Sequence, residues 1–242
     1  MKIVSEIRNF IKQAIAMEDN PSSTQSLTNS EKEGLPNGEL IFTNNWFSLL
    51  KDVWEELIPQ IKPNKILEIG SYEGASACYL ISKLAQESPI EIHCIDTWEG
   101  GVEHTENAHD MASVENRFHH NTKIAIGSVP HNVDLIVHKG LSDFHLAKLL
   151  SQQRSNYFDL VYVDGSHQAS DVLTDAVLGF KLLKVGGYMF FDDYLWAEDL
   201  PYGKDPLRCP KMAIDAFINC NFRKIQIVPA LLRQLYVQKI AE

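Results

Sequence analysis

The sequence predicts an α/β fold: a seven-stranded, mostly parallel sheet with helices on both faces and an antiparallel hairpin at its C-terminal end. From residue 44 onward, apolar runs of strand length alternate with segments of helical periodicity. This alternation is typical of right-handed crossovers between parallel strands. Only a few residues separate the last two apolar runs, too few for a crossover helix, so these strands should pair antiparallel.

Each expected strand is a short apolar run with a turn signal at its end. The strands are 65–69, 90–96, 134–138, 158–164, 187–192, 223–228 and 233–240. The expected helices share an apolar stripe at helical spacing and are 44–62, 74–87, 142–153, 169–184 and 208–219. No internal repeat interrupts this order, which indicates a single domain over residues 44–242.

Two further segments stand outside the alternation. Residues 1–43 are expected to form an amphipathic N-terminal helix followed by a flexible linker, because 18–40 collects Asp, Asn, Ser, Thr, Pro and Gly. That helix is expected either to cap the fold or to serve a homo-oligomer. Residues 103–127 are polar and rich in histidine, and are expected to form an insertion made of a helix and a loop.

Composition excludes some classes of partner. The formal net charge is −10, from 22 Lys+Arg against 32 Asp+Glu, so a nucleic-acid backbone would be repelled in general. The first 17 residues contain no continuous apolar block, so we expect neither a signal peptide nor a membrane partner. The four cysteines form no CxxC pair and are expected to be reduced. We therefore expect a cytoplasmic protein that acts on a small molecule.

A glycine turn follows the first strand. Gly70 and Gly74 bracket Ser71, Tyr72 and Glu73 at the start of a predicted helix, whose first amides would favour a polar or anionic ligand. A dinucleotide fingerprint requires glycine where Tyr72 stands, which disfavours NAD or FAD. The alternative is a tight strand-to-helix turn that binds nothing.

Asp96 ends the second predicted strand, beside this turn. An acid at that position would accept hydrogen bonds from both hydroxyls of a ribose. Together with the glycine turn, it indicates a nucleoside cofactor. The alternative is a solvated acid that caps the following loop.

Acidic residues end two further strands. Asp164 and His167 follow the run 158–163, and Asp192 and Asp193 follow the run 187–191. If these strands are parallel neighbours, their carboxyl ends bring the four side chains to one edge of the sheet. Oxygen ligands of this kind suit Mg²⁺, and adjacent like charges repel unless a cation or a proton intervenes. Each residue also has a structural alternative, as a helix cap, a loop acid or a histidine bonded to a carbonyl.

These motifs carry a family resemblance. Glu68-x-Gly70-x-x-x-Gly74 resembles the first motif of class I S-adenosylmethionine-dependent methyltransferases. The segment from Phe158 to His167, followed by Gly186-Gly187 and then Asp192-Asp193-Tyr194, resembles the small metal-dependent O-methyltransferases of the macrocin and novobiocin-sugar type. The resemblance covers roughly residues 64 to 196 and implies a Rossmann-like class I methyltransferase fold.

The resemblance also implies the site residues. It places Mg²⁺ at Asp164, Asp192 and Asp193. It also implies that Asp164 and His167 are the catalytic residues, with His167 as the base for the acceptor hydroxyl. The S-adenosylmethionine site is expected to contain the residues of the first motif, of the next two strand ends and of the acidic edge: Glu68, Gly70, Ser71, Tyr72, Gly74, Asp96, Thr97, Ser142 and Asp164. Ser142 lies where this fold contacts adenine, and its alternative role is the N-cap of the following helix.

The expected activity is therefore Mg²⁺-assisted O-methylation, by S-adenosylmethionine, of a hydroxyl on a sugar diol or a catechol-like molecule. A metal that chelates two acceptor oxygens would orient one of them in line with the methyl group. Three alternatives stay open at this point: a metal-independent small-molecule methyltransferase, a nicotinamide-dependent oxidoreductase, and a binding module without turnover.

Overall fold

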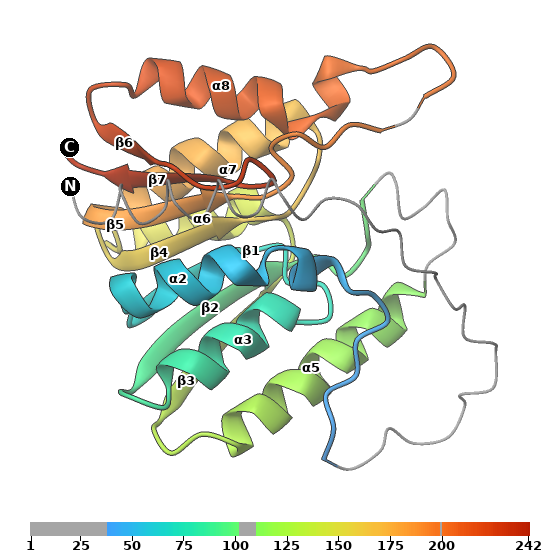
Figure 1. Cartoon of the computed structure of the whole chain (residues 1–242), viewed down its shortest axis with the longest axis vertical. Coiled ribbons are helices and arrows are strands. Elements are labelled where there is room, and N and C mark those ends of the chain that lie inside the picture. The colour runs from blue at the N-terminus through green and yellow to red at the C-terminus, as the bar shows by residue number, and fades with distance from the viewer. Residues whose placement is uncertain (1–37, 102–109, 199) are drawn as a thin grey trace.

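The computed structural model describes residues 38–101, 110–198 and 200–242, which form a seven-stranded sheet in the order β3-β2-β1-β4-β5-β7-β6 (Figure 1). Strands β3, β2, β1, β4 and β5 are parallel, and β7 lies antiparallel between β5 and β6. The strands are β1 (Lys65–Ile69), β2 (Ile90–Asp96), β3 (Val133–Lys139), β4 (Phe158–Val163), β5 (Leu183–Phe191), β6 (Ile225–Val228) and β7 (Leu235–Lys239). The predicted fold class is confirmed.

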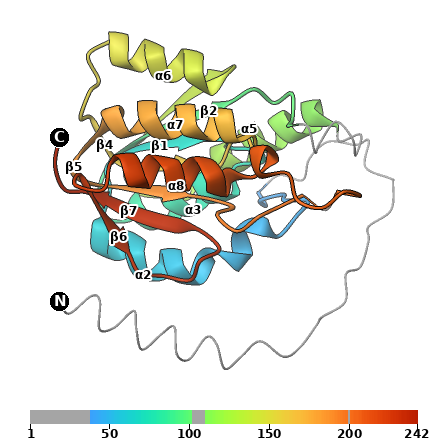
Figure 2. The ribbon, with the colours of Figure 1, turned by 90° about the horizontal axis from the view of Figure 1, so that it is seen from above.

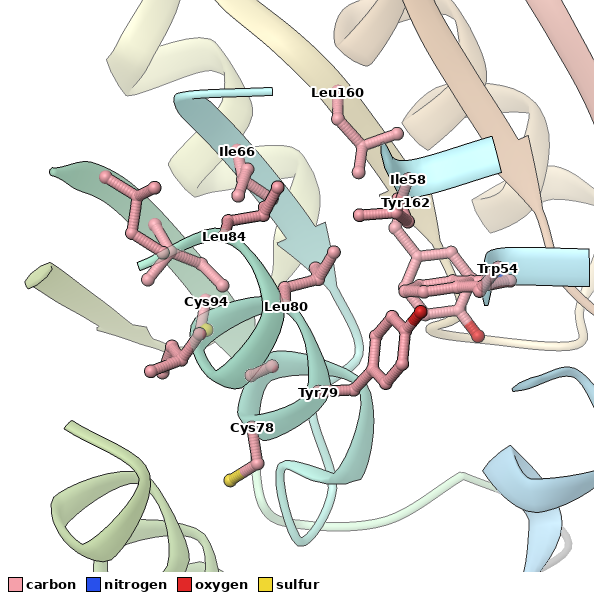
Figure 3. Close-up of a cluster of buried hydrophobic side chains, with 14 of the residues drawn as sticks. Trp54, Ile58, Ile66, Cys78, Tyr79, Leu80, Leu84, Cys94, Leu160 and Tyr162 are labelled. Carbon is pink, nitrogen blue, oxygen red and sulfur yellow. The ribbon is translucent and has the colours of Figure 1, made fainter. Parts of the chain in front are cut away.

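Helices cover both faces of this sheet (Figure 2). On one face lie α2 (Lys51–Ile61), α3 (Ala75–Leu84) and α5 (Met111–Gly127), and on the other lie α6 (Ser142–Ser151), α7 (Ala169–Leu182) and α8 (Pro210–Cys220). Each face has its own apolar core because consecutive strand residues point to opposite faces. Figure 3 shows the first core, where Trp54, Tyr79 and Tyr162 meet aliphatic side chains from α3 and β1.

Several predicted boundaries shift. Strand β5 begins at Leu183 rather than 187, because the chain passes directly from α7 into an extended stretch that pairs Leu183 with Phe158. The single helix expected after residue 44 is a 3-10 turn (Trp46–Leu49) followed by α2. In the insertion, α5 begins at Met111, and residues 102–109 lie outside the described residues, as do residues 1–37 with the expected N-terminal helix.

None of the helices in the described ranges is both long and apolar enough to span a bilayer.

The ends of β1 and β4 approach each other closely at Gly70. Its amide donates to Ile95 O at 2.8 Å, and the Asp164 amide donates to Ile69 O at 2.8 Å, which continues the sheet past both strand ends. Gly70 has φ of +85°, and a β-carbon there would lie 1.9 Å from Asp164 O. Only glycine fits this position, for reasons of both backbone conformation and space.

We expect Gly70→Ala to destabilise the protein by more than about 3 kcal/mol, because a clash with backbone adds to an unfavourable positive φ. Gly127→Ala is the matched control, since no heavy atom lies within 4 Å of a β-carbon at that position. Urea unfolding of both variants measures the difference. Equal stability of the two variants would contradict the close approach of β1 to β4.

A pair of histidines links β2 and β3 beneath α6. His93 Nδ1 lies 2.8 Å from His138 Nε2, and His93 Nε2 lies 2.8 Å from Glu91 Oε1. One proton joins the two rings, so protonating both would place two cations in contact. Burial, with the nearby charge of His93, lowers the pKa of His138 to about 4.

The lowered pKa has a definite consequence for stability. The unfolded chain binds a proton at His138 below about pH 6.5, whereas the folded chain binds it only near pH 4. The stability that comes from the neutral ring is therefore fully present above pH 6.5, and the free energy of unfolding decreases as the pH falls toward 4. We expect urea unfolding between pH 6.5 and 4 to show a steeper loss of stability in the wild type than in His138→Gln, by at most about 1.4 kcal/mol per pH unit. Parallel curves for the two proteins would contradict this.

Candidate active site

A cleft of about 990 Å³ lies at the carboxyl ends of the parallel strands. Its floor is formed by the ends of β1, β2, β4 and β5, and one wall comes from the segment before α2. That wall is apolar and aromatic, with Phe42, Trp46, Phe47 and Leu49. Trp46 is 52% exposed and Leu49 is 55% exposed, so both present apolar surface to the cleft mouth.

Asp96 organises the glycine turn. Its Oδ2 accepts hydrogen bonds from the amides of Ser71 (2.8 Å) and Tyr72 (2.9 Å), and its Oδ1 accepts one from the Trp98 amide at 2.7 Å. The carboxylate therefore joins the turn after β1 to the loop after β2. Both lone pairs of Oδ2 are used, so the carboxylate can offer a ligand one remaining lone pair, on Oδ1.

The turn is held in an unusual conformation. Tyr72 has φ of +48°, which is uncommon outside glycine, and its carbonyl accepts a hydrogen bond from Trp98 Nε1 at 2.9 Å. Trp98 is only 4% exposed and packs on Phe118 at a ring distance of 4.9 Å. It therefore supports the turn from inside the core.

Glu68 lies under the turn, fully buried. Its two oxygens accept hydrogen bonds from Ser71 Oγ and Ser76 Oγ, each at 2.5 Å, and burial raises its pKa. Gly74 has φ of +79° and is the N-cap of α3. Glu68 and Gly74 therefore support the conformation of the turn from its buried side.

The structure gathers most of the predicted cofactor residues. The cleft is lined by Gly70, Ser71, Tyr72, Asp96, Thr97, Ser142 and Asp164. Ser142 is the first residue of α6, and the N-cap is Leu141, without a side-chain bond. The alternative role of Ser142 as an N-cap is therefore wrong.

The three predicted metal-binding acids converge. Asp164, Asp192 and Asp193 each offer one carboxylate oxygen, and these atoms lie within 4.8 Å of one another, the one such cluster in the described part of the chain. Burial raises the pKa of Asp164 well above its usual range, and the charges of Asp192 and Asp193 raise it further. Burial and the charge of Asp193 raise the pKa of Asp192 to about 6. The N-cap of α7 is Gln168, so Asp164 does not cap that helix.

Tyr162, which sequence reasoning treated as part of an apolar strand, lies between two of these acids. Its hydroxyl contacts Asp164 Oδ2 at 2.9 Å and also Asp192 Oδ2. A hydroxyl has one proton and can satisfy only one carboxylate at a time. The second contact is favourable only when a proton or a cation neutralises part of the charge.

A buried chain of hydrogen bonds fixes the Tyr162 hydroxyl. It accepts from Gln234 Nε2 at 3.2 Å, while Gln234 Oε1 accepts from Trp54 Nε1 at 2.8 Å and from the Tyr236 hydroxyl at 2.5 Å. Gln234 is 1% exposed. The chain connects α2 and β7 to the acids, and no sequence motif marks it, because its members are far apart in the sequence.

His167 lies beside the acids. Its Nε2 is 2.8 Å from Asp193 Oδ2, and its ring stacks on Trp196 with centroids 4.0 Å apart. Asp193 thereby orients the imidazole from one nitrogen. Trp196 lines the cleft, while the Tyr194 hydroxyl donates to Asp215 Oδ1 at 2.8 Å.

A second buried acid that sequence reasoning missed ties the outer wall to the turn. Glu73 is 2% exposed and accepts hydrogen bonds from the Thr43 amide (2.7 Å), the Thr43 hydroxyl (2.6 Å) and Arg117 Nε (2.6 Å). The segment before α2 and helix α5 are thus both anchored at the glycine turn. In the sequence, the only indication of this anchoring role is that a glutamate lies within the glycine turn.

This arrangement combines three chemical capacities in one cleft. The cluster of hard oxygen ligands suits a divalent cation, which would relieve the repulsion among the Asp164, Asp192 and Asp193 side chains. The turn offers backbone groups to a polar ligand. The His167 imidazole, held by Asp193, provides a nitrogen base at the edge of the acid cluster.

Comparisons with known proteins agree with this geometry. Residues 67–194, more than half of the chain, match the family model described as a methyltransferase domain. A curated, uncharacterized protein of Acanthamoeba polyphaga mimivirus is 44% identical over 39 residues, and this match spans 16% of the chain and 18% of that relative.

Solved structures share the fold at low sequence identity. The O-methyltransferase TomG from Streptomyces achromogenes has a TM-score of 0.51 and 17% identity, with 84% of this chain and 82% of that chain covered. A Corynebacterium glutamicum protein has a TM-score of 0.52 and 16% identity, with 83% and 92% covered. The prediction of a class I S-adenosylmethionine-dependent methyltransferase is confirmed at the level of family and fold, and the chain belongs to the methyltransferase domain family.

Proposed function

We propose that this protein transfers a methyl group from S-adenosylmethionine to a hydroxyl of a small molecule, with a divalent cation held by Asp164, Asp192 and Asp193. The observation that carries the proposal is the convergence of these three carboxylates, within 4.8 Å, in the same cleft as the glycine turn. Family membership supports the methyl transfer, and the chemistry of the acids supports the cation and the oxygen acceptor.

The cofactor would lie along the glycine turn. Asp96 orders the amides of Ser71 and Tyr72 and keeps one lone pair, on Oδ1, for a ribose hydroxyl. TomG was solved in complex with S-adenosylmethionine, which supports the same cofactor here. The bound sulfonium supplies an electrophilic methyl group.

The cation site is built only of oxygen. Asp164, Asp192 and Asp193 would hold Mg²⁺, which favours hard oxygen ligands and keeps sites for water or substrate. When bound, Mg²⁺ lowers the pKa of an acceptor hydroxyl and favours its ionised form. Tyr162 fixes the side chains of Asp164 and Asp192, so the site is preorganised by the core below it.

His167 is proposed as the base. Because Asp193 Oδ2 lies against Nε2 at 2.8 Å, the carboxylate orients the ring and stabilises its protonated form. The imidazole would accept the proton of the acceptor hydroxyl during transfer. Trp196 covers one face of the ring and limits the access of water to it.

The walls of the cleft bear on the acceptor class. Phe42, Trp46 and Trp196 line the cleft with flat apolar surfaces, and Trp196 lies against His167 beside the acids, which suits an aromatic diol of the catechol type. A vicinal diol on a sugar is the second candidate, because the acids require only two neighbouring oxygens. Family membership leaves no support for the nicotinamide-dependent oxidoreductase considered from the sequence, whereas the metal-independent methyltransferase remains the alternative.

Isothermal calorimetry with S-adenosylhomocysteine and Mg²⁺ tests the proposal. We expect the wild type to bind both, and Asp192→Asn to bind S-adenosylhomocysteine while its Mg²⁺ affinity falls by at least about 100-fold, since even loss of an outer-shell partner costs about 10- to 100-fold. Asp134→Asn, an exposed acid at the opposite end of β3, is the charge-matched control.

The two parts of the proposal fail separately in this experiment. If wild type and Asp192→Asn bind Mg²⁺ equally, the cation site is wrong and the metal-independent alternative stands. If the wild type does not bind S-adenosylhomocysteine, the cofactor assignment is wrong.

Turnover tests the role of His167. We expect His167→Gln to lower kcat for methylation of an aromatic diol by about 100- to 10,000-fold, because glutamine can still bond to Asp193 but cannot accept a proton. The affinity for S-adenosylhomocysteine should not change. The assay measures formation of S-adenosylhomocysteine over a panel of catechols and sugar diols, with Mg²⁺ and with EDTA. Undiminished kcat in the variant would remove the base assignment.

A further inference from the structure

One basic side chain lines the acidic cleft. Arg233 is the only lysine or arginine among the described residues that line it, whereas eight carboxylic acids do so. These acids are Glu73, Asp96, Asp143, Asp164, Asp171, Asp175, Asp192 and Asp193. The protein as a whole is also acidic, with a formal net charge of −10. Because a guanidinium keeps its charge at every working pH, Arg233 is a fixed positive group where all the other fixed charges are negative.

The antiparallel end of the sheet brings Arg233 to the acids. Strand β7 pairs with β5 so that Leu235 faces Phe191, and Arg233 comes just before this pair. The Arg233 carbonyl accepts a hydrogen bond from the Tyr194 amide at 3.1 Å, which continues the contact past the strand ends. Arg233 therefore lies across from the chain that leaves β5, next to Asp193.

The backbone at this point is fixed, whereas the side chain has no protein partner. The next residue, Gln234, is 1% exposed and bonds to the Tyr162 hydroxyl at 3.2 Å. Arg233 itself is exposed, and its guanidinium has no hydrogen bond or ion pair with any residue that the structure describes. Asp193 bonds to His167 instead. The positive charge is therefore left for a ligand.

The chemistry of the cleft indicates which anion this charge would take. A guanidinium presents a planar fork of donors that matches a carboxylate or a phosphate in a bidentate contact. A phosphate group carries nearly two negative charges, so the surrounding acids repel it more strongly than a carboxylate, which carries one. A single arginine among these acids therefore favours a carboxylate.

The order of the strands indicates which molecule carries the carboxylate. The acids of the proposed cation site follow β4 and β5, with β1 and its glycine turn on one side and β7 on the other. A methyl donor bound along the turn would approach the acids from the β1 side. A group that reaches Arg233 extends from the acids in the opposite direction, which is the direction left for the acceptor.

We propose that Arg233 binds a carboxylate of the acceptor, so that the preferred acceptor is an aromatic diol that carries a carboxylate. This inference rests on the proposed function, because it takes the two hydroxyls of the diol to be held at the acids. It makes Arg233 a specificity-determining residue that selects an anionic diol over an uncharged one of the same size.

Calorimetry with matched acids and amides tests the contact. The probes are 3,4-dihydroxybenzoate, 3,4-dihydroxyphenylacetate and 3,4-dihydroxyphenylpropanoate, each compared with its uncharged amide in the presence of S-adenosylhomocysteine and Mg²⁺. We expect the wild type to bind at least one acid about 5- to 30-fold more tightly than its amide, as for a partly exposed hydrogen bond between charged groups. Arg233→Ala should lose this preference.

Three controls separate recognition from a general effect of charge or folding. Arg233→Lys keeps the charge but not the planar fork and should retain only part of the preference. Arg223→Ala removes another exposed arginine, in the turn before β6 and away from the cleft, and should leave the preference unchanged. The Tm of each ligand-free variant should match that of the wild type, because both arginines are exposed.

The methyl donor has a carboxylate of its own, and the same proteins distinguish this source. We expect S-adenosylhomocysteine to bind equally well to the wild type and to Arg233→Ala. Weaker binding of S-adenosylhomocysteine by the variant, with no preference of the wild type for any acid over its amide, would assign Arg233 to the donor and overturn the proposal.

The wild type alone separates this inference from the proposed function. If it binds S-adenosylhomocysteine and Mg²⁺ but prefers none of the acids over their amides, this inference is wrong and the proposed function stands. If it does not bind S-adenosylhomocysteine, both are wrong.

Discussion

The structure depends on one electrostatic constraint: three carboxylates share one edge of the sheet with a single hydroxyl between two of them. Asp164, Asp192 and Asp193 repel one another, and Tyr162 has only one proton to give. Burial strengthens the repulsion because it removes water. The hydrophobic cores on both faces of the sheet must therefore hold these side chains together in the absence of a cation. Like charges held this close together are expected at a site that binds a positively charged ion.

The same sheet edge connects the acids to the glycine turn. Because Gly70 allows β1 to pass within backbone contact of Asp164, the turn and the acids form one rigid floor. Asp96 extends this floor to β2, and Glu73 attaches the apolar wall to it. Binding at the turn and at the acids is therefore expected to act on a common, preorganised surface and to require little rearrangement of the strands.

Sequence patterns were sufficient for the sheet and for the acids, because apolar runs locate strands and parallel strands bring their ends to one edge. They could not reveal Tyr162 or Gln234, since both lie within strand-like apolar stretches where side-chain partners depend on residues up to 180 positions away. The placement of β5 also depended on its pairing with β4, which the sequence alone does not define.

If the three acids hold a cation beside the cofactor, anomalous diffraction from crystals grown with Mn²⁺ and S-adenosylhomocysteine will locate it. Mn²⁺ has the oxygen preference of Mg²⁺ and a strong anomalous signal. We expect one anomalous peak within bonding distance, about 2.0–2.3 Å, of oxygens from Asp164, Asp192 and Asp193. A peak elsewhere, or bound S-adenosylhomocysteine with no Mn²⁺ at these acids, would contradict it.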